Sequence, residues 1–172
     1  MAHAPSLSFR RLTRMDEALP TSGPIQAAVY PAISYDEFGR LLRKFGYPAQ
    51  PALDQGRFGF RTLTEPRFSA WMQTPFRHGR HDEFASVFLF GHVTVPTLIA
   101  PAAVRALQWE LMFAHVTLRH ASRLVATHTL VVHGGVTEHY IREQLGYWVG
   151  DLERIRNEVR SQTRRATGSQ LH

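Results

Sequence analysis

Two histidines and an aspartate lie within one polar segment, residues 77–83 (RHGRHDE). Imidazole nitrogens and carboxylate oxygens are competent ligands for zinc or nickel, so His78, His81 and Asp82 are the metal candidates of this sequence. Arg77 and Arg80 would repel a cation, and the HxxH spacing lies in a predicted turn without a further ligand elsewhere. We therefore expect no bound metal.

The sequence lacks the groups that nucleophilic and phosphate-transferring enzymes use. It has no cysteine, and no serine lies in a G-x-S-x-G turn. Gly134 and Gly135 follow a predicted strand and precede a predicted helix, but the GGVT segment has neither a GxGxxG pattern nor a following Gly-Lys pair. The glycines are expected to form a left-handed turn, with an incidental anion site at Val136 and Thr137 as the alternative. We predict a non-enzymatic protein without a cofactor.

A second group of histidines lies on two predicted neighbouring strands. Successive side chains of a strand point to opposite faces, so alternation separates these residues and no face collects three of them from one strand. We interpret them as partly exposed sheet residues, with pH sensing as the alternative. The group comprises His115, His120, His128 and His133.

Arginine supplies almost all of the positive charge. Lys+Arg number 20 against 14 Asp+Glu, which gives a net charge of +6 at pH 7, and Lys44 is the one lysine. A GC-rich genome accounts for such a bias, but a positive surface also attracts polyanions. Pairs such as Arg57-Phe58 add aromatic rings that can stack on bases, although phenylalanine at every second position is also typical of a sheet core. The candidate anion contacts are Arg10, Arg11, Arg14, Arg154, Arg156 and Arg160.

Hydrophobic periodicity predicts three helices and five strands. A helix over about 34–45 begins at Ser34, whose hydroxyl can cap the first turn, and a second helix over about 101–112 follows two prolines. The third helix begins at Thr137 and carries an apolar stripe with alternating intervals of four and three, which indicates helix packing. This stripe comprises Ile141, Leu145, Trp148, Leu152, Ile155 and Val159. The predicted strands are 57–63, 67–76, 85–95, 114–121 and 124–132.

The resulting order, α-β-β-β-α-β-β-α, indicates an α+β fold: an antiparallel sheet of about five strands with helices packed on one face. Residues 1–33 are expected to form a weakly ordered arm, residues 34–162 the domain, and residues 163–172 a polar tail. The apolar stretches are shorter than a membrane span, and the first twenty residues lack the continuous apolar region of a secretory signal. We therefore expect a cytoplasmic protein.

The element order and two segments resemble the bacterial YbjN family, whose domain shares this order with class I type III secretion chaperones. Residues 133–152 (HGGVTEHYIREQLGYWVGDL) are similar to the Gly-Gly-Val-Thr turn and the following amphipathic helix of that family. Residues 38–48 (FGRLLRKFGYP) are similar to its first helix and Gly-Tyr exit. The resemblance covers about residues 34–160 and implies the fold above, in a family described as regulators of sensing or stress that offers no catalytic residues.

The resemblance and the absence of catalytic motifs together predict a YbjN-like, protein-binding or chaperone-type regulatory module that acts as a homodimer. In the resembled chaperones an extended partner segment wraps the dimer, which is close to groove docking or strand addition. The alternatives are a type III secretion chaperone proper and a basic nucleic-acid-binding regulator. We expect the partner or dimer surface to include Trp71, Trp148, Ile155 and Val159.

Overall fold

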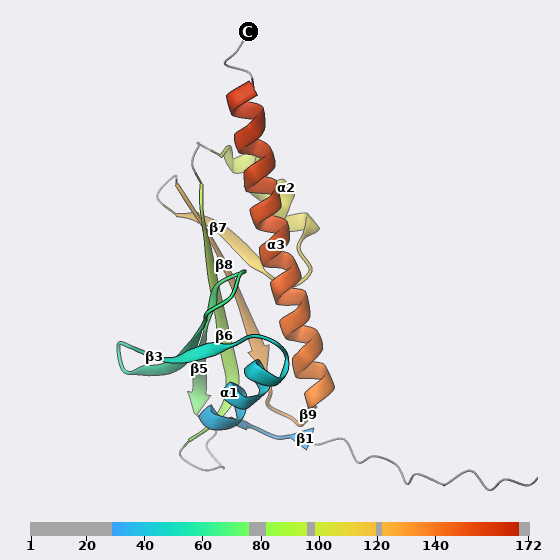
Figure 1. Ribbon diagram of the computed structural model, residues 1–172. Coiled ribbons are helices and arrows are strands. Elements are labelled where there is room, and N and C mark those ends of the chain that lie inside the picture. The colour runs from blue at the N-terminus through green and yellow to red at the C-terminus, as the bar shows by residue number, and fades with distance from the viewer. Residues whose placement is uncertain (1–28, 76–81, 96–98, 120–121, 169–172) are drawn as a thin grey trace, which may run out of the picture.

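The computed structural model describes residues 29–75, 82–95, 99–119 and 122–168 (Figure 1). It has helices α1 (Tyr35–Lys44), α2 (Pro101–Glu110) and α3 (Glu138–Gly168). The longer strands are β3 (Ala49–Asp54), β4 (Arg57–Thr62), β5 (Phe68–Pro75), β6 (Glu83–Thr94), β7 (His115–Arg119) and β8 (Arg123–Val131). Two-residue strands are β1 (Val29–Tyr30), β2 (Ile33–Ser34) and β9 (Val136–Thr137). The predicted α+β class is confirmed.

The main sheet is antiparallel and has the order β3-β4-β5-β6-β8-β7, with β2 paired to β6. The five predicted strands correspond to β4–β8, but the predicted strand number is too low because β3 and the two-residue strands were missed. β3 contains Pro51 and lacks β-branched residues, so its sequence does not have the pattern of a strand. It lies at the edge of the sheet, where a proline is tolerated.

The helices cover one face of this sheet, and α3 runs along the direction of the long strands (Figure 1). The apolar stripe of α3 faces the sheet, since Trp148 and Ile155 have no exposed surface and Leu152 is 1% exposed. Gly91 on β6 makes this approach possible: a Cβ atom there would lie 2.7 Å from Leu152 Cδ2. The prediction that the stripe is a packing surface is confirmed. Within the described residues, no helix combines the length and apolar character that crossing a bilayer requires.

Side-chain caps mark the first turns of α1 and α3, and a glycine turn precedes α3. Ser34 Oγ accepts a hydrogen bond from the Glu37 amide at 3.2 Å, and Thr137 Oγ1 accepts one from the Tyr140 amide at 3.2 Å. Gly134 and Gly135 have φ angles of 97° and 87°, as a left-handed turn requires. Regular structure extends past both expected domain boundaries, because β1 and β2 lie at residues 29–30 and 33–34 and α3 continues to residue 168. α2 ends two residues before the predicted 112.

Candidate functional site

The face of the sheet opposite the helices carries a row of aromatic side chains. On β6, Phe88, Phe90 and His92 alternate with residues 87, 89 and 91, which are buried against the helices. Trp71 on β5 pairs directly with Phe88, and therefore points to the same open face. Trp71, Phe88 and Phe90 are only partly buried. We refer to these three residues as the aromatic floor.

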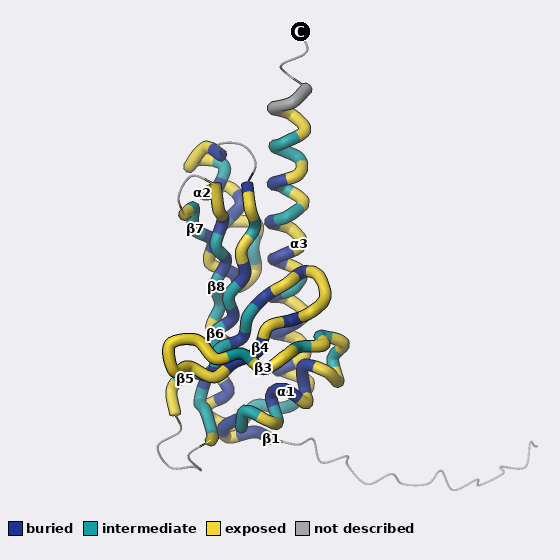
Figure 2. The backbone as a smooth tube through the Cα atoms, turned by 60° about the vertical axis from the view of Figure 1, so that its left-hand side comes forward, coloured by how far each residue is buried: buried dark blue, intermediate teal, exposed yellow. Residues whose placement is uncertain are grey.

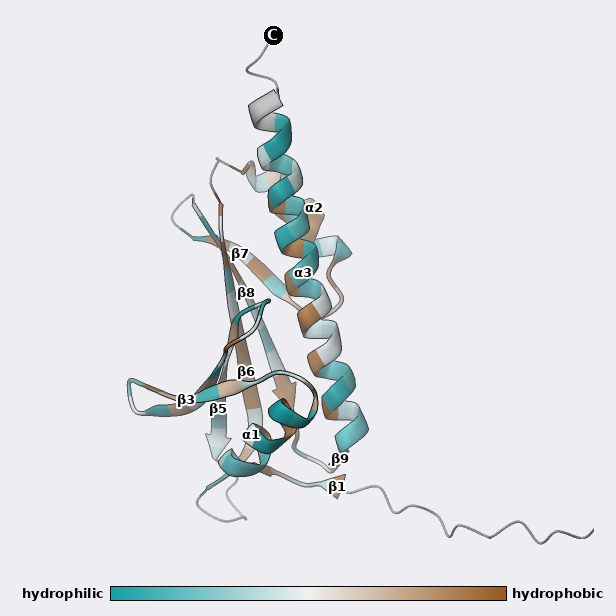
Figure 3. Ribbon diagram, in the orientation of Figure 1, coloured by the Kyte–Doolittle hydropathy of each residue, from teal (hydrophilic) through white to brown (hydrophobic). Residues whose placement is uncertain are grey.

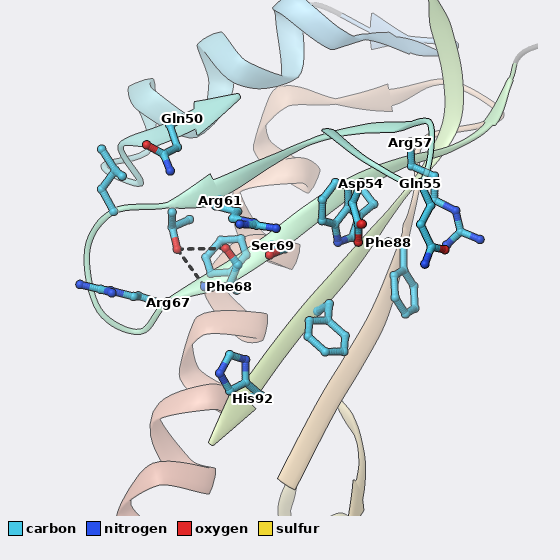
Figure 4. Close-up of a pocket in the computed structure, with 14 residues that line it drawn as sticks. Gln50, Asp54, Gln55, Arg57, Arg61, Arg67, Phe68, Ser69, Phe88 and His92 are labelled. Atoms are coloured by element: carbon cyan, nitrogen blue, oxygen red, sulfur yellow. Dashed lines mark hydrogen bonds between the residues drawn. The ribbon is translucent and has the colours of Figure 1, made fainter. Parts of the chain in front are cut away.

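A hollow of about 690 Å³ lies over the aromatic floor. The β3–β4 hairpin forms one of its walls: it runs across the direction of the long strands (Figure 1), and its tip is exposed (Figure 2). From this hairpin, Arg57, Arg61 and Asp54 line the hollow, while Phe88 and His92 enter from β6 (Figure 4). Neither arginine forms an ion pair with an acidic residue of the described chain. The hollow therefore combines apolar rings with unneutralised guanidinium groups.

The position of Trp71 depends on a glycine of the neighbouring strand. Gly59 on β4 pairs with Trp71, and a Cβ atom at Gly59 would lie 2.4 Å from the Ala70 carbonyl oxygen and 2.6 Å from Trp71 Cε3. The Tyr35 hydroxyl donates a hydrogen bond to the Gly59 carbonyl at 3.1 Å. The absence of a side chain at Gly59 thus leaves the space in which the indole ring lies across β4.

Beside this hollow, one carboxylate links the β4–β5 turn to α3. Glu65 Oε2 accepts a hydrogen bond from Arg156 Nη1 at 2.6 Å, and Glu65 Oε1 lies 3.7 Å from Arg67 Nε. Glu65 is therefore shared between two arginines that belong to separate elements. Its side chain is 57% exposed, so the interaction is screened by solvent and contributes little to stability.

A second surface, on the helical side, is apolar. Trp109 is 90% exposed and Met112 is 63% exposed, and the ring of Phe113 lies 5.3 Å from that of Tyr147 on α3. We refer to these four residues as the Trp109 patch. The loop that carries Met112 and Phe113 is fixed by Asp151 of α3, whose carboxylate accepts hydrogen bonds from the amides of residues 112, 113 and 114 at 3.0, 2.8 and 2.8 Å.

His128 lies behind the Trp109 patch, between the sheet and α3. Its ring centroid is 5.5 Å from that of Phe113 and 6.5 Å from that of Trp148, and its Nε2 atom is buried without a hydrogen-bond partner. Burial lowers the pKa of His128, while a hydrogen bond with Gln144 and the charge of Asp151 oppose that shift. Burial thus favours the neutral imidazole over its protonated form.

The His128 environment predicts a loss of stability in mild acid. Because the pKa of His128 is lower in the folded than in the unfolded chain, unfolding takes up a proton once the pH falls below about 6.5. The free energy of unfolding should decrease from there until His128 titrates in the folded state. Urea denaturation between pH 8 and pH 5 measures this, with His128→Gln reducing the dependence and His115→Gln, at an exposed position, serving as control. An unchanged pH dependence in His128→Gln would contradict the prediction.

The residues that the sequence analysis predicted for a partner surface and for anion contacts do not lie together in the structure. Trp71 lies on the open face, but Trp148, Ile155 and Val159 are at most 5% exposed and do not form a surface of the folded chain. That part of the predicted partner surface needs correction, because these residues belong to the stripe packed on the sheet. Arg156 and Arg160 line hollows, whereas Arg154 donates a hydrogen bond to the Glu110 carbonyl. Outside the described residues lie Arg10, Arg11, Arg14, His78, His81 and His120.

Asp82, the remaining metal candidate, is exposed, and the described residues contain no cluster of three or more His, Asp or Glu side chains that could hold a metal ion. The histidines of the β7–β8 hairpin lie as alternation predicts: His115 is exposed and His128 is directed toward the helices. Sequence reasoning missed Phe88 and Phe90 as surface residues. Their alternation with Val87 and Leu89 on one strand is the signal that would have found them.

Comparison with known proteins gives a similarity of fold. No family model matches this chain, and no curated protein sequence matches it. The structure is similar to that described as "Crystal structure of YbjN, a putative transcription regulator from E. coli", with a TM-score of 0.48 and 14% sequence identity. The similarity covers 77% of this chain and 92% of the YbjN chain. YbjN is the family that the sequence resembles, and the similarity concerns the fold only.

Proposed function

We propose that this chain is a non-enzymatic protein-binding module that acts as a homodimer, and that the Trp109 patch is the surface on which two copies meet. The observation that carries the proposal is the 90% exposure of Trp109, followed three and four residues later in the chain by two further exposed apolar side chains, Met112 and Phe113. Burying an aromatic side chain removes roughly 150–250 Å² from water, which is worth on the order of 4–6 kcal/mol before the costs of association.

The composition and rigidity of the patch support a second copy as the occupant. Tryptophan, tyrosine, phenylalanine and methionine are enriched in interfaces, and homodimer interfaces are more apolar than transient ones. Asp151 holds the loop of the patch through three hydrogen bonds, and Arg154 binds the last carbonyl of α2, at Glu110. A surface that is already fixed loses little conformational entropy on association.

The sequence resemblance to secretion chaperones, in which a partner segment wraps a dimer, agrees with this arrangement. A dimer formed through the Trp109 patch leaves the open face of each sheet accessible. Regulation or chaperoning of a protein partner would then take place on the dimer, as the resemblance implies, with Trp71 on the accessible face.

Replacement of Trp109 by alanine is expected to weaken dimerisation by about 2 kcal/mol or more, which is roughly 30-fold in the dissociation constant. Sedimentation velocity over a range of micromolar concentrations measures the change. Leu53→Ser is the matched control, because Leu53 is 65% exposed but lies on the β3–β4 hairpin, away from the patch. A wild-type chain that stays monomeric, or a Trp109→Ala chain that dimerises as the wild type does, would show that the proposal is wrong.

A further inference from the structure

Three hollows join into a path lined by arginines, which leads from the open face of the sheet to α3. Arg67 and His92 line both the hollow over the aromatic floor and a second hollow of about 420 Å³. The second hollow shares Arg156 with a third, of about 400 Å³, which adds Arg160 and Arg164 of α3. We refer to the whole set as the arginine track: Arg57, Arg61, Arg67, Arg156, Arg160 and Arg164.

The charge balance of the track favours an anionic ligand with several charges in a row. Its six arginines face two carboxylates among the lining residues, Asp54 and Glu65. Three of the arginines recur every fourth residue along α3, which corresponds to steps of about 6 Å. The C-terminal turns of α3 are hydrophilic, in contrast to the middle of the helix (Figure 3). A linear polyanion can therefore meet guanidinium groups at successive positions.

The aromatic floor indicates which kind of polyanion fits the site best. Trp71, Phe88 and Phe90 offer rings beside the arginines, and nucleic acid bases stack on such rings whatever their sequence. An acidic peptide has the charges but no base to place on the floor. A duplex keeps its bases stacked inside, and its stiffness opposes bending around the sheet edge between β5 and α3. A single-stranded nucleic acid can both stack bases on the floor and bend around the sheet edge, because its bases are free and its backbone is flexible.

We propose that the arginine track and the aromatic floor form a binding site for single-stranded nucleic acid, with bases on the floor and phosphates on the arginines. In the free protein the Glu65 carboxylate occupies the place of a phosphate between Arg67 and Arg156, in the second hollow. The Trp109 patch lies outside the track, so this site is independent of the proposed dimer surface. It adds a second function to that of a protein-binding module.

Fluorescence anisotropy with the full chain tests the proposal. The probes are labelled oligothymidine and oligouridine, a DNA duplex of the same length, and a peptide of the same length rich in aspartate and glutamate. We expect the single strands to bind most tightly, with an affinity that falls steeply as salt is raised. The slope of log K against log salt should approach about −4 if all six arginines contact phosphates, because each contact contributes about −0.7.

Substitutions identify the site. Arg61→Ala and Arg156→Ala should each weaken binding and make the salt slope shallower by about 0.7. Glu65→Gln should strengthen binding, because it frees Arg67 and Arg156. Arg105→Ala is the matched control, since Arg105 is exposed on α2 outside the track and its loss removes the same charge.

Trp71→Ala should weaken binding about 5- to 150-fold through the loss of stacking, and Trp71→Phe should restore most of it. Circular dichroism and thermal melting of each variant establish that it is folded. The proposal is overturned if the single strands do not bind at the lowest salt, or if Arg105→Ala weakens binding as much as Arg61→Ala. Equally tight binding of the acidic peptide or of the duplex, with the same dependence on the arginines, would also overturn it and would assign the track to that ligand.

Discussion

Replacement of Asp151 by alanine is expected to lower the free energy of unfolding by about 3–5 kcal/mol. The carboxylate is 3% exposed and accepts hydrogen bonds from three successive backbone amides, at Met112, Phe113 and Ala114. Hydrogen bonds to a charged acceptor are stronger than neutral ones, and an amide left without a partner in a buried position retains its full desolvation cost. Alanine would remove the acceptor of all three amides, and the hydrogen bond of the Ala114 amide is buried.

Two further variants test whether the loss of stability comes from the hydrogen bonds that Asp151 accepts. Asp151→Asn keeps one oxygen but directs an NH₂ group toward amide donors, so we expect a smaller loss of about 2–3 kcal/mol. Glu153→Ala removes an exposed carboxylate two residues further along α3 and should stay within about 0.5 kcal/mol of the wild type. Urea denaturation measures all three. If Asp151→Ala were as stable as Glu153→Ala, the three hydrogen bonds would not hold the loop.

Replacement of Asp151 should weaken the proposed dimer as well as the folded chain. The loop that Asp151 fixes carries Met112 and Phe113, so its release would disorder the Trp109 patch. Asp151→Asn should therefore weaken dimerisation even under conditions where the chain stays folded, which sedimentation velocity would detect. A dimer as tight as that of the wild type would show that the loop conformation does not matter for association.

Local periodicity was sufficient to predict most of the fold. Alternation in residues 57–62 and 68–75 identified β4 and β5, and the stripe that includes Trp148 identified α3 and its buried face. These signals depend on neighbours in sequence, which a pattern can report. β3 was missed because its strand character comes from pairing with β4 through a two-residue turn at Gln55 and Gly56, both with positive φ, rather than from its own residues.

The candidate sites depend on residues that are distant in sequence. Arg61 and Arg67 line one hollow, and Arg67 and Arg156 line the next, because the β4–β5 turn packs beside α3, a contact that no local pattern contains. The exposure of Trp109 was not predictable either, because a local pattern does not tell which face of α2 is covered: Val104 and Leu107 are buried, and Trp109 is 90% exposed. The positive charge and the aromatic residues are therefore evident from the sequence, and the fold determines which of them share a surface.

The replacement of Trp148 by alanine has the second large expected effect, a loss of about 3–5 kcal/mol in the free energy of unfolding. The indole has no exposed surface, and its centroid lies 6.2 Å from that of Phe68 in an edge-to-face arrangement. Alanine would leave a cavity between α3 and β6, next to Gly91, where close packing leaves no side chain to refill it.

The variant Trp148→Phe distinguishes the cost of a cavity from the effect of removing the buried indole N–H group. The Nε1 atom of Trp148 is buried without a hydrogen-bond partner, so phenylalanine removes an unsatisfied donor together with part of the ring. We expect a loss of only about 1–2 kcal/mol, because the smaller cavity is partly offset by relief of that donor. Trp109→Ala, at an exposed position, should change stability by less than about 0.5 kcal/mol while it weakens dimerisation. If instead Trp148→Ala left stability unchanged and abolished association, Trp148 would belong to the partner surface expected from the sequence, and the burial of the α3 stripe would be the wrong account of this helix.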